Sequence, residues 1–175
     1  MGSFPTAYLF SKLVYHKDIL QEGSGNVGTL NFLRISKSKT LSVLVLIIDM
    51  GKGFLIIWIA SKFLQPSQWV FPVTAVILGH IYPVWLKGKG GRGLATLAGV
   101  FLFLKPLLFL LWWVFFGVLY LSFRKYIVAG VLALLMVNVI TLIFLEKSLF
   151  VILSAASVIV FYKYIPRVKE ELTMT

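Results

Sequence analysis

The stretch TLSVLVLIIDMGKGFLIIWIASKF, residues 40–63, decides the fold class of this chain. A helix crosses the apolar part of a bilayer with about 20 apolar residues, and this stretch is long enough to do so. Its interior carries Asp49 and Lys52, whose i, i+3 spacing puts both side chains on one helical face. Charge at that depth costs about 2.5–3.5 kcal/mol per residue on insertion scales and marks a functional site by default. The alternatives are a self-compensating structural pair, or a helix that starts later and brings both residues near the membrane surface. Gly51 and Gly53 flank Lys52 and would let another backbone or a ligand approach closely.

The rest of the chain has the same apolar character. Its 175 residues are 59% hydrophobic and only 13% charged, with a mean hydropathy of +0.95, whereas about a quarter of the residues in a water-soluble domain are charged. We therefore predict an all-α integral membrane protein, with residues 1–175 forming one domain of about seven transmembrane or partly embedded helices. The expected helices cover residues 2–14, 40–63, 67–86, 93–104, 107–123, 127–145 and 148–162. The aromatic run 112–116 is predicted to be a lipid-facing or packing surface.

The basic residues predict the orientation in the membrane. If the chain alternates from an outside N-terminus, one side holds thirteen of the Lys and Arg residues and the other side three, with Lys52 inside a span. Cytoplasmic loops carry the excess of Lys and Arg, so we expect the N-terminus outside and the C-terminus in the cytoplasm. This predicts a multi-pass protein of the cell (inner) membrane. The net charge of +11 lies between long apolar runs rather than on an amphipathic surface, which argues against a nucleic-acid partner.

The chain has no cysteine and two histidines. Disulfides, thiolate nucleophiles and cysteine-ligated metals are therefore excluded, and a histidine-rich metal site is not expected. We predict no metal and no cofactor. His80 is isolated in the sequence, and an isolated histidine is more often a hydrogen-bonded interhelical residue than a catalyst.

Two glycine-rich loops fall on the predicted cytoplasmic side, where long polar loops usually carry function. Residues 87–93 read KGKGGRG and open into a helix. Successive glycines can turn backbone N–H groups toward an anion, and the following helix N-terminus adds its positive dipole end. Lys89 and Arg92 supply full charge at the candidate site, Lys87 precedes it, and the glycines in question are Gly90, Gly91 and Gly93. The loop is therefore a candidate phosphate cradle, with a flexible turn as the alternative.

The second loop reads EGSGNVGTLNFLR over residues 22–34. It offers hydrogen-bonding groups suited to a phosphate or to glycerol hydroxyls, and Arg34 could bind a phosphate bidentately. The residues of interest are Gly23, Ser24, Gly25, Asn26, Asn31 and Arg34. A solvated loop built from turn-favouring residues is the alternative.

Taken in order, these segments resemble the bacterial membrane acyltransferases that use acyl phosphate and glycerol 3-phosphate. The similarity starts at Gly2-Ser3-Phe4-Pro5 and extends over roughly the first hundred residues. It continues through Gly23-Ser24-Gly25-Asn26-Val27-Gly28, Asn31, Arg34, Asp49-x-x-Lys52-Gly53, Gly79-His80-x-x-Pro83 and Lys89-Gly90-Gly91-Arg92-Gly93. Near the C-terminus the family carries a histidine and an asparagine where this chain has Tyr164 and Arg167.

The resemblance implies a seven-helix fold with a cytoplasmic active site, where the 1-hydroxyl of glycerol 3-phosphate attacks the acyl phosphate carbonyl. The products would be lysophosphatidic acid and phosphate, with the substrate's own phosphate assisting proton removal. The candidate catalytic residues are Ser24, Arg34 and Arg92. The candidate substrate-binding residues are Gly23, Gly25, Asn26, Asn31, Asp49, Lys52, Gly53, His80, Lys89, Gly90, Gly91 and Gly93.

The expected partners are acyl phosphate, glycerol 3-phosphate and membrane lipid, and a soluble enzyme that produces acyl phosphate is a candidate. Two other functions stay open. A non-catalytic membrane relative could bind anionic lipid or a partner enzyme through the same basic loops. A small transporter could place its ion site at Asp49 and Lys52, although the sequence lacks the internal repeat typical of that class.

Overall fold

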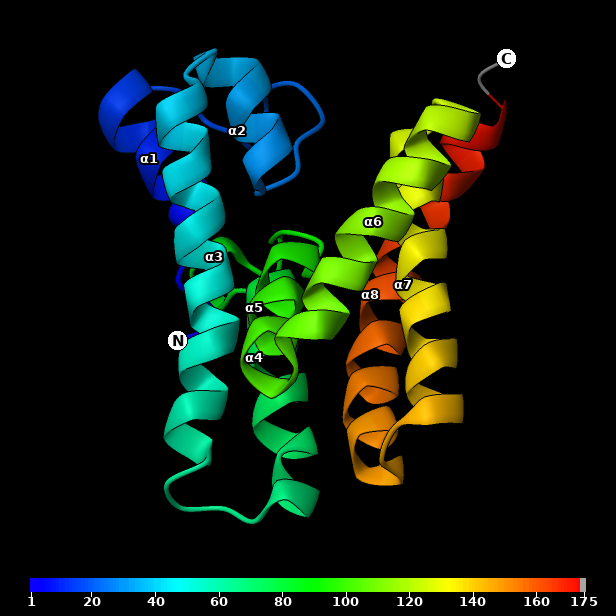
Figure 1. The fold of residues 1–175 in the computed structure, drawn as a ribbon. Coiled ribbons are helices and arrows are strands. Elements are labelled where there is room, and N and C mark those ends of the chain that lie inside the picture. Colours follow the sequence, from blue (N-terminus) through cyan, green and yellow to red (C-terminus); the bar gives the residue numbers. More distant parts are fainter. Residues whose placement is uncertain (174–175) are drawn as a thin grey trace.

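The computed structural model describes residues 1–173, and over these residues the chain is helical with no strand. This confirms the all-α prediction. Figure 1 shows the helices running roughly alongside one another, with the tilted α6 crossing between the two halves. The α-helices are α1 (Thr6–Tyr15), α2 (Thr29–Ser36), α3 (Lys39–Ala60), α4 (Val70–Ile81), α5 (Leu94–Leu104), α6 (Pro106–Phe123), α7 (Tyr126–Phe144) and α8 (Lys147–Thr173). Two short 3₁₀ turns, η1 (Pro66–Gln68) and η2 (Val84–Leu86), flank α4.

Within residues 1–173, five segments are long and apolar enough to cross a membrane. These are α3, the segment from η1 through η2, α6, α7 and α8, whereas α5 is apolar but shorter. The protein is thus a multi-pass membrane protein. The count of seven helices and the side on which each terminus lies stay predictions.

Three expected boundaries were wrong. The stretch after Asn26 was expected to be loop, but it contains α2, which is short and ends at Lys37 in the left-handed conformation (φ 55°). The helix expected to end at residue 162 continues to Thr173 and includes Pro166. The helix expected over residues 67–86 is regular only in α4, since Pro83 disfavours helical backbone at the residue before it.

Two cores hold the helices together. The larger core is built from buried side chains of α3 through α8. The smaller core joins α1, α2 and the start of α3 to the loop between α1 and α2, and Phe32 of α2 is fully buried in it. Figure 1 places α2 at the same end of the molecule as the C-terminal part of α8. Residues of both glycine-rich loops and of α8 between Tyr162 and Arg167 line a common cavity.

Helices α3 and α5 approach each other at backbone distance. A Cβ atom added to Gly53 would collide with the carbonyl oxygen of Thr96, and one added to Gly99 would collide with that of Met50. Small residues at such crossings let backbones pack closely inside a membrane. The expected close approach of another backbone is confirmed at Gly53, whereas a Cβ at Gly51 would meet no atom within 4 Å. This crossing fixes the N-terminus of α5 against the middle of α3.

Candidate active site

The charged pair on α3 is buried, and one carboxylate oxygen of Asp49 is shared by several protein groups. Lys52 Nζ lies 2.6 Å from Asp49 Oδ1 and 2.5 Å from the carbonyl oxygen of Phe4. The hydroxyl of Thr6 donates to the same Asp49 oxygen at 2.9 Å, and His80 Nδ1 lies 3.9 Å from it. The pair thus fastens the N-terminal segment to α3 and α4, as the structural alternative in the sequence analysis supposed.

The glycines of the 87–93 loop shape its path against α4. The N–H of Gly91 donates to the carbonyl of His80, and that of Gly90 donates to the carbonyl of Ile81, both at 3.1 Å. A Cβ on Gly91 would overlap the imidazole of His80. These two N–H groups are therefore occupied, and they do not face an anion as the glycine spacing suggested.

Arg92 and the N-terminus of α5 are the part of this loop that remains available to bind an anion. Gly93 caps α5 in a left-handed conformation (φ 87°), and the first intrahelical N–H belongs to Leu97. The N–H groups before Leu97 have no helical partner, which is the usual state of a helix N-terminus. Burial lowers the pKa of the Arg92 guanidinium below its ordinary value, and the nearby Tyr164 hydroxyl partly offsets that effect. A partly buried cation thus lies beside a helix N-terminus, a combination that favours anions.

The 22–34 loop is held in shape by one side chain. Asn31 is almost fully buried, its Oδ1 accepts the N–H of Ser24 at 2.8 Å, and its Nδ2 donates to the carbonyls of Ile19 and Glu22. Gly23 and Gly25 adopt positive φ values of 59° and 65°, which most residues avoid. Asn31 is thereby committed to the loop, and we assign it a positioning role.

Ser24, Arg34 and Arg92, which come from three separate parts of the sequence, line one cavity. We call it the arginine cavity. It has a volume of about 370 Å³, and Asn26, Asn31, Tyr126, Arg167, Glu170 and Glu171 also line it. Arg34 lies on α2, Arg167 lies on α8, and Arg92 lies in the loop before α5. Charge-assisted, bidentate hydrogen bonds make arginine the preferred partner of phosphate.

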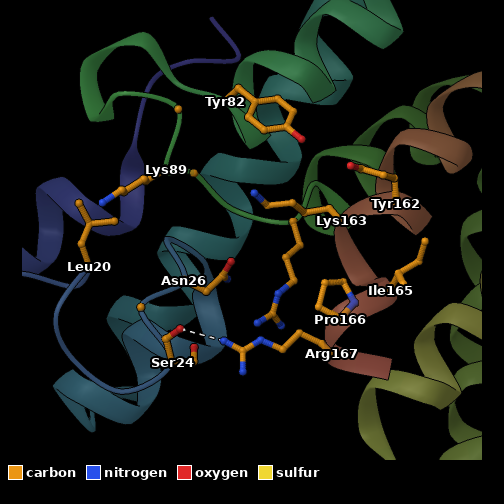
Figure 2. A pocket seen from close by; sticks show the side chains of 14 residues that line it. Leu20, Ser24, Asn26, Tyr82, Lys89, Tyr162, Lys163, Ile165, Pro166 and Arg167 are labelled. Atoms are coloured by element: carbon orange, nitrogen blue, oxygen red, sulfur yellow. Dashed lines mark hydrogen bonds between the residues drawn. The ribbon is translucent and has the colours of Figure 1, made fainter. Parts of the chain in front are cut away.

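A second cavity of about 580 Å³ adjoins the first and shares Ser24, Asn26, Arg92 and Arg167 with it. We call it the loop cavity. Figure 2 shows Arg167 reaching from α8 to Ser24, whereas Lys163 points toward Tyr82 and its ammonium lies 4.9 Å from that ring's centroid. Lys89 also lines the space. Lys163 was not among the residues expected at the site. The signal for it is the switch from the apolar run of α8 to Lys163 and Arg167, whose i, i+4 spacing puts them on one helical face.

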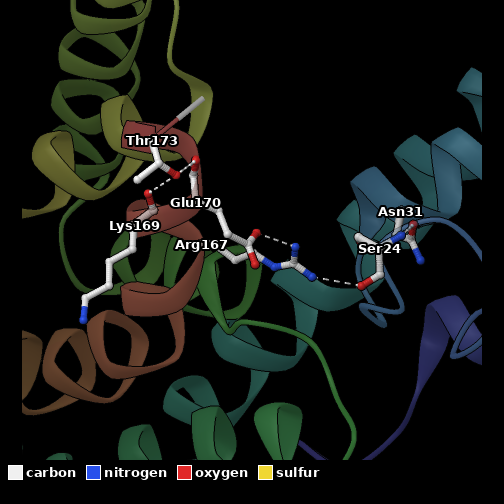
Figure 3. A network of polar contacts seen from close by, with 6 residues as sticks. All are labelled: Ser24, Asn31, Arg167, Lys169, Glu170 and Thr173. Atoms are coloured by element: carbon white, nitrogen blue, oxygen red, sulfur yellow. Dashed lines mark hydrogen bonds and ion pairs between the residues drawn. The ribbon is translucent and has the colours of Figure 1, made fainter. Parts of the chain in front are cut away.

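Arg167 spans the boundary between these cavities. Its guanidinium donates to the carbonyl oxygen of Ser24 at 3.1 Å and pairs with Glu170 at 2.6 Å (Figure 3). Glu171 accepts the N–H groups of Ile127 and Val128 and so caps α7. Both acidic side chains of the arginine cavity therefore have partners already.

An apolar groove of about 290 Å³ meets the cavities at Arg92, Asn26 and Tyr126. Its walls come from α3, α5 and α6 and include Leu46, Met50, Ala98, Phe109, Trp112 and Trp113; Asp49, His80 and Tyr164 also line it. Trp112 is buried and donates its indole N–H to the carbonyl of Gly130, whereas Trp113 is 45% exposed. The aromatic run thus serves packing as expected, but it also forms a wall of the groove. The groove suits an alkyl chain whose polar end lies at Arg92.

Within residues 1–173, no group of three or more His, Cys, Asp or Glu side chains is arranged to hold a metal ion. The arginines and the α5 N-terminus can bind an anion beside the apolar groove, which can take an apolar chain. The structure brings together Ser24, Asn26, Lys89, Arg34 and Arg92, and it leaves Lys52 and Gly53 outside these cavities.

Comparisons with known proteins agree with this geometry. A family model described as glycerol-3-phosphate acyltransferase matches residues 1–173. The glycerol-3-phosphate acyltransferase of Staphylococcus saprophyticus is 41% identical over 139 residues, which cover 73% of this chain and 66% of that protein. The enzyme of the same name from Syntrophomonas wolfei is 37% identical over 131 residues, covering 74% of this chain and 66% of its own length. The matches thus span just under two thirds of these curated relatives.

Solved structures extend the similarity over nearly the whole chain. An integral membrane glycerol 3-phosphate acyltransferase in its glycerol 3-phosphate form superposes with a TM-score of 0.85 at 26% identity, covering 98% of this chain and 88% of that one. Its lysophosphatidic acid form gives a TM-score of 0.87 at 28% identity, covering 98% and 86%.

Proposed function

Since the chain belongs to the glycerol-3-phosphate acyltransferase family, we propose that it transfers an acyl group from acyl phosphate to the 1-hydroxyl of glycerol 3-phosphate. The hydroxyl oxygen attacks the acyl carbonyl carbon, the bond from that carbon to the phosphate oxygen breaks, and the hydroxyl proton leaves with phosphate. The products are lysophosphatidic acid and inorganic phosphate. The resemblance drawn from the sequence motifs is thereby confirmed at the level of the family.

One observation carries the proposal: Ser24, Arg34 and Arg92 converge on a single cavity that opens into an apolar groove. A transferase for these substrates must hold two phosphates and one alkyl chain together. The groove fits the alkyl chain, and Arg92 with the α5 N-terminus lies where the acyl phosphate head would sit. Arg34 and Arg167 then face the phosphate of glycerol 3-phosphate.

Catalysis would rest on positioning and on neutralising phosphate charge. Holding the glycerol hydroxyl next to the acyl carbonyl converts a bimolecular step into an effectively unimolecular one. Glu170 and Glu171 are engaged with Arg167 and with the α7 backbone. The proton is therefore assigned to a substrate phosphate, because neither carboxylate is poised to take it.

The remaining assignments follow the charge distribution. We place the cavities on the cytoplasmic side of the inner membrane, because most of the basic loop residues gather at that end of the predicted topology. Residues 1–175 then form one domain, with the N-terminus outside. A soluble enzyme that produces acyl phosphate is the proposed partner on that side.

A second function has one observation in its favour. The Ser24 carbonyl and Glu170 already occupy the guanidinium of Arg167, which suits a non-catalytic relative that binds anionic lipid through its remaining cations. The acyltransferase would form lysophosphatidic acid, whereas the lipid-binding relative would form no product.

The test is lysophosphatidic acid formation by purified protein in detergent or lipid, with palmitoyl phosphate and labelled glycerol 3-phosphate. We expect product from the native chain and a loss of about 100-fold or more in kcat/KM for Arg34→Ala, because a phosphate clamp acts on bound charge. Lys39→Ala is the matched control, since Lys39 is exposed and outside the cavities. Folded native protein that forms no product would overturn the acyltransferase and favour the lipid-binding relative.

A further inference from the structure

The two arginines nearest the cavity junction are held in different ways. Arg167 uses its donors on Glu170 and on the carbonyl of Ser24. Arg92 has no carboxylate at ion-pairing distance within residues 1–173. Its guanidinium carbon instead lies 5.4 Å from the ring centroid of Tyr164. Arg92 is thus positioned without a counter-ion.

Tyr164 is itself firmly placed. It belongs to the main hydrophobic core, with 9% of its surface exposed, and it sits on α8 where that helix packs against α4 and α7. The same side chain lines the apolar groove beside Arg92. The ring therefore offers Arg92 a fixed aromatic surface at the point where the groove meets the polar cavities.

An aromatic surface holds a cation without consuming its hydrogen-bond donors. The attraction comes from the ring quadrupole, whereas a carboxylate partner would accept the guanidinium N–H groups and compete with phosphate for them. A partly buried arginine with free donors at a fixed position is what a phosphate clamp requires.

We propose that Tyr164 is a positioning residue, which holds the guanidinium of Arg92 at the junction of the cavities with its donors free for a substrate phosphate. This inference rests on the proposed function. It adds a residue that does not touch the reacting atoms and acts through Arg92. It also gives a reason for an aromatic ring at this place rather than an acidic side chain.

The test compares Tyr164→Phe, which keeps the ring, with Tyr164→Leu, which removes it. For Tyr164→Leu we expect about a tenfold increase in the dissociation constant and the KM of palmitoyl phosphate, whose head group is assigned to Arg92, with smaller changes in the KM of glycerol 3-phosphate and in kcat. For Tyr164→Phe we expect values within about threefold of the native protein, since the ring face remains. Tyr120→Leu on α6 is the matched control, because Tyr120 does not line the cavities.

Each variant is repeated in an Arg92→Ala background, where Tyr164→Leu should have no further effect on binding. A purely structural role would give the same additional loss in both backgrounds, and thermal unfolding in detergent reports that role separately. Native-like binding by Tyr164→Leu, or equal losses for the Phe and Leu variants, would overturn the inference. So would native protein that does not bind palmitoyl phosphate. Native protein that binds it but forms no product would overturn only the proposed catalysis.

Discussion

The buried pair on α3 and the arginine cavity both place charge inside an apolar protein, and they differ in what neutralises it. Asp49 and Lys52 neutralise each other, Asp49 also accepts from the hydroxyl of Thr6, and Lys52 also donates to the carbonyl of Phe4. In the cavity, Arg92 lies beside Tyr164 and has no carboxylate at ion-pairing distance within residues 1–173. A charge that the protein satisfies internally holds the structure together, whereas a charge that it leaves unsatisfied is available for a ligand.

The largest expected effect comes from breaking the α3 pair. Asp49→Ala leaves the ammonium of Lys52 buried without its counter-ion, which should cost about 3–5 kcal/mol of unfolding free energy. The measurement is thermal unfolding in detergent. The double variant Asp49→Ala/Lys52→Met should recover most of the loss, because no unpaired charge remains. A single variant as stable as the native protein would show that the pair is not structural.

The complementary change is made in the cavity. Arg92→Ala should lower kcat/KM by about 100- to 1,000-fold, as expected when a group that stabilises transition-state charge is removed. Its unfolding temperature should stay at the native value, in contrast to Asp49→Ala. The kcat/KM of Arg92→Lys should lie between that of the native protein and that of Arg92→Ala, since lysine keeps the charge but loses the planar set of donors. An Arg92→Ala protein that unfolds early and keeps its activity would reverse the contrast between the two regions.

The smallest expected effect concerns the intermediate case, Arg167, whose charge is only partly neutralised. Glu170→Gln removes its counter-ion, and the KM for glycerol 3-phosphate should fall about two- to fivefold, the range of a partly exposed ion pair. Glu146→Gln, outside the three cavities that Arg92 lines, is the control and should leave KM unchanged. A higher KM for Glu170→Gln would mean that the carboxylate orients Arg167 rather than restraining it.

The long apolar helices could be predicted from sequence because each carries its own signal over many residues. The short α2 could not, since its eight residues are mixed in character and are held by the tertiary burial of Phe32. The end of α8 was missed because Pro166 and several charged residues interrupt the apolar run after Tyr162. Only packing and the cap that Glu171 gives to α7 show that the helix continues.

The site was predicted in part. The ordered motifs named Ser24, Arg34 and Arg92, and the structure brings these three together. Spacing could not show that Gly90 and Gly91 use their N–H groups on the end of α4, because those acceptors lie outside the loop. Nor could local patterns show that Arg167 faces Ser24, since 143 residues separate them.

That separation also sets when the site can exist during biosynthesis. A ribosome that adds about 5–20 residues per second needs roughly 7 to 30 seconds to pass from Ser24 to Arg167. In the later part of that time, once Arg92 has been added, the nascent chain still lacks the α8 residues that complete the cavity. The contact between Arg167 and Ser24 therefore closes late, and an emerging polypeptide cannot assemble the complete cavity until α8 has been synthesised.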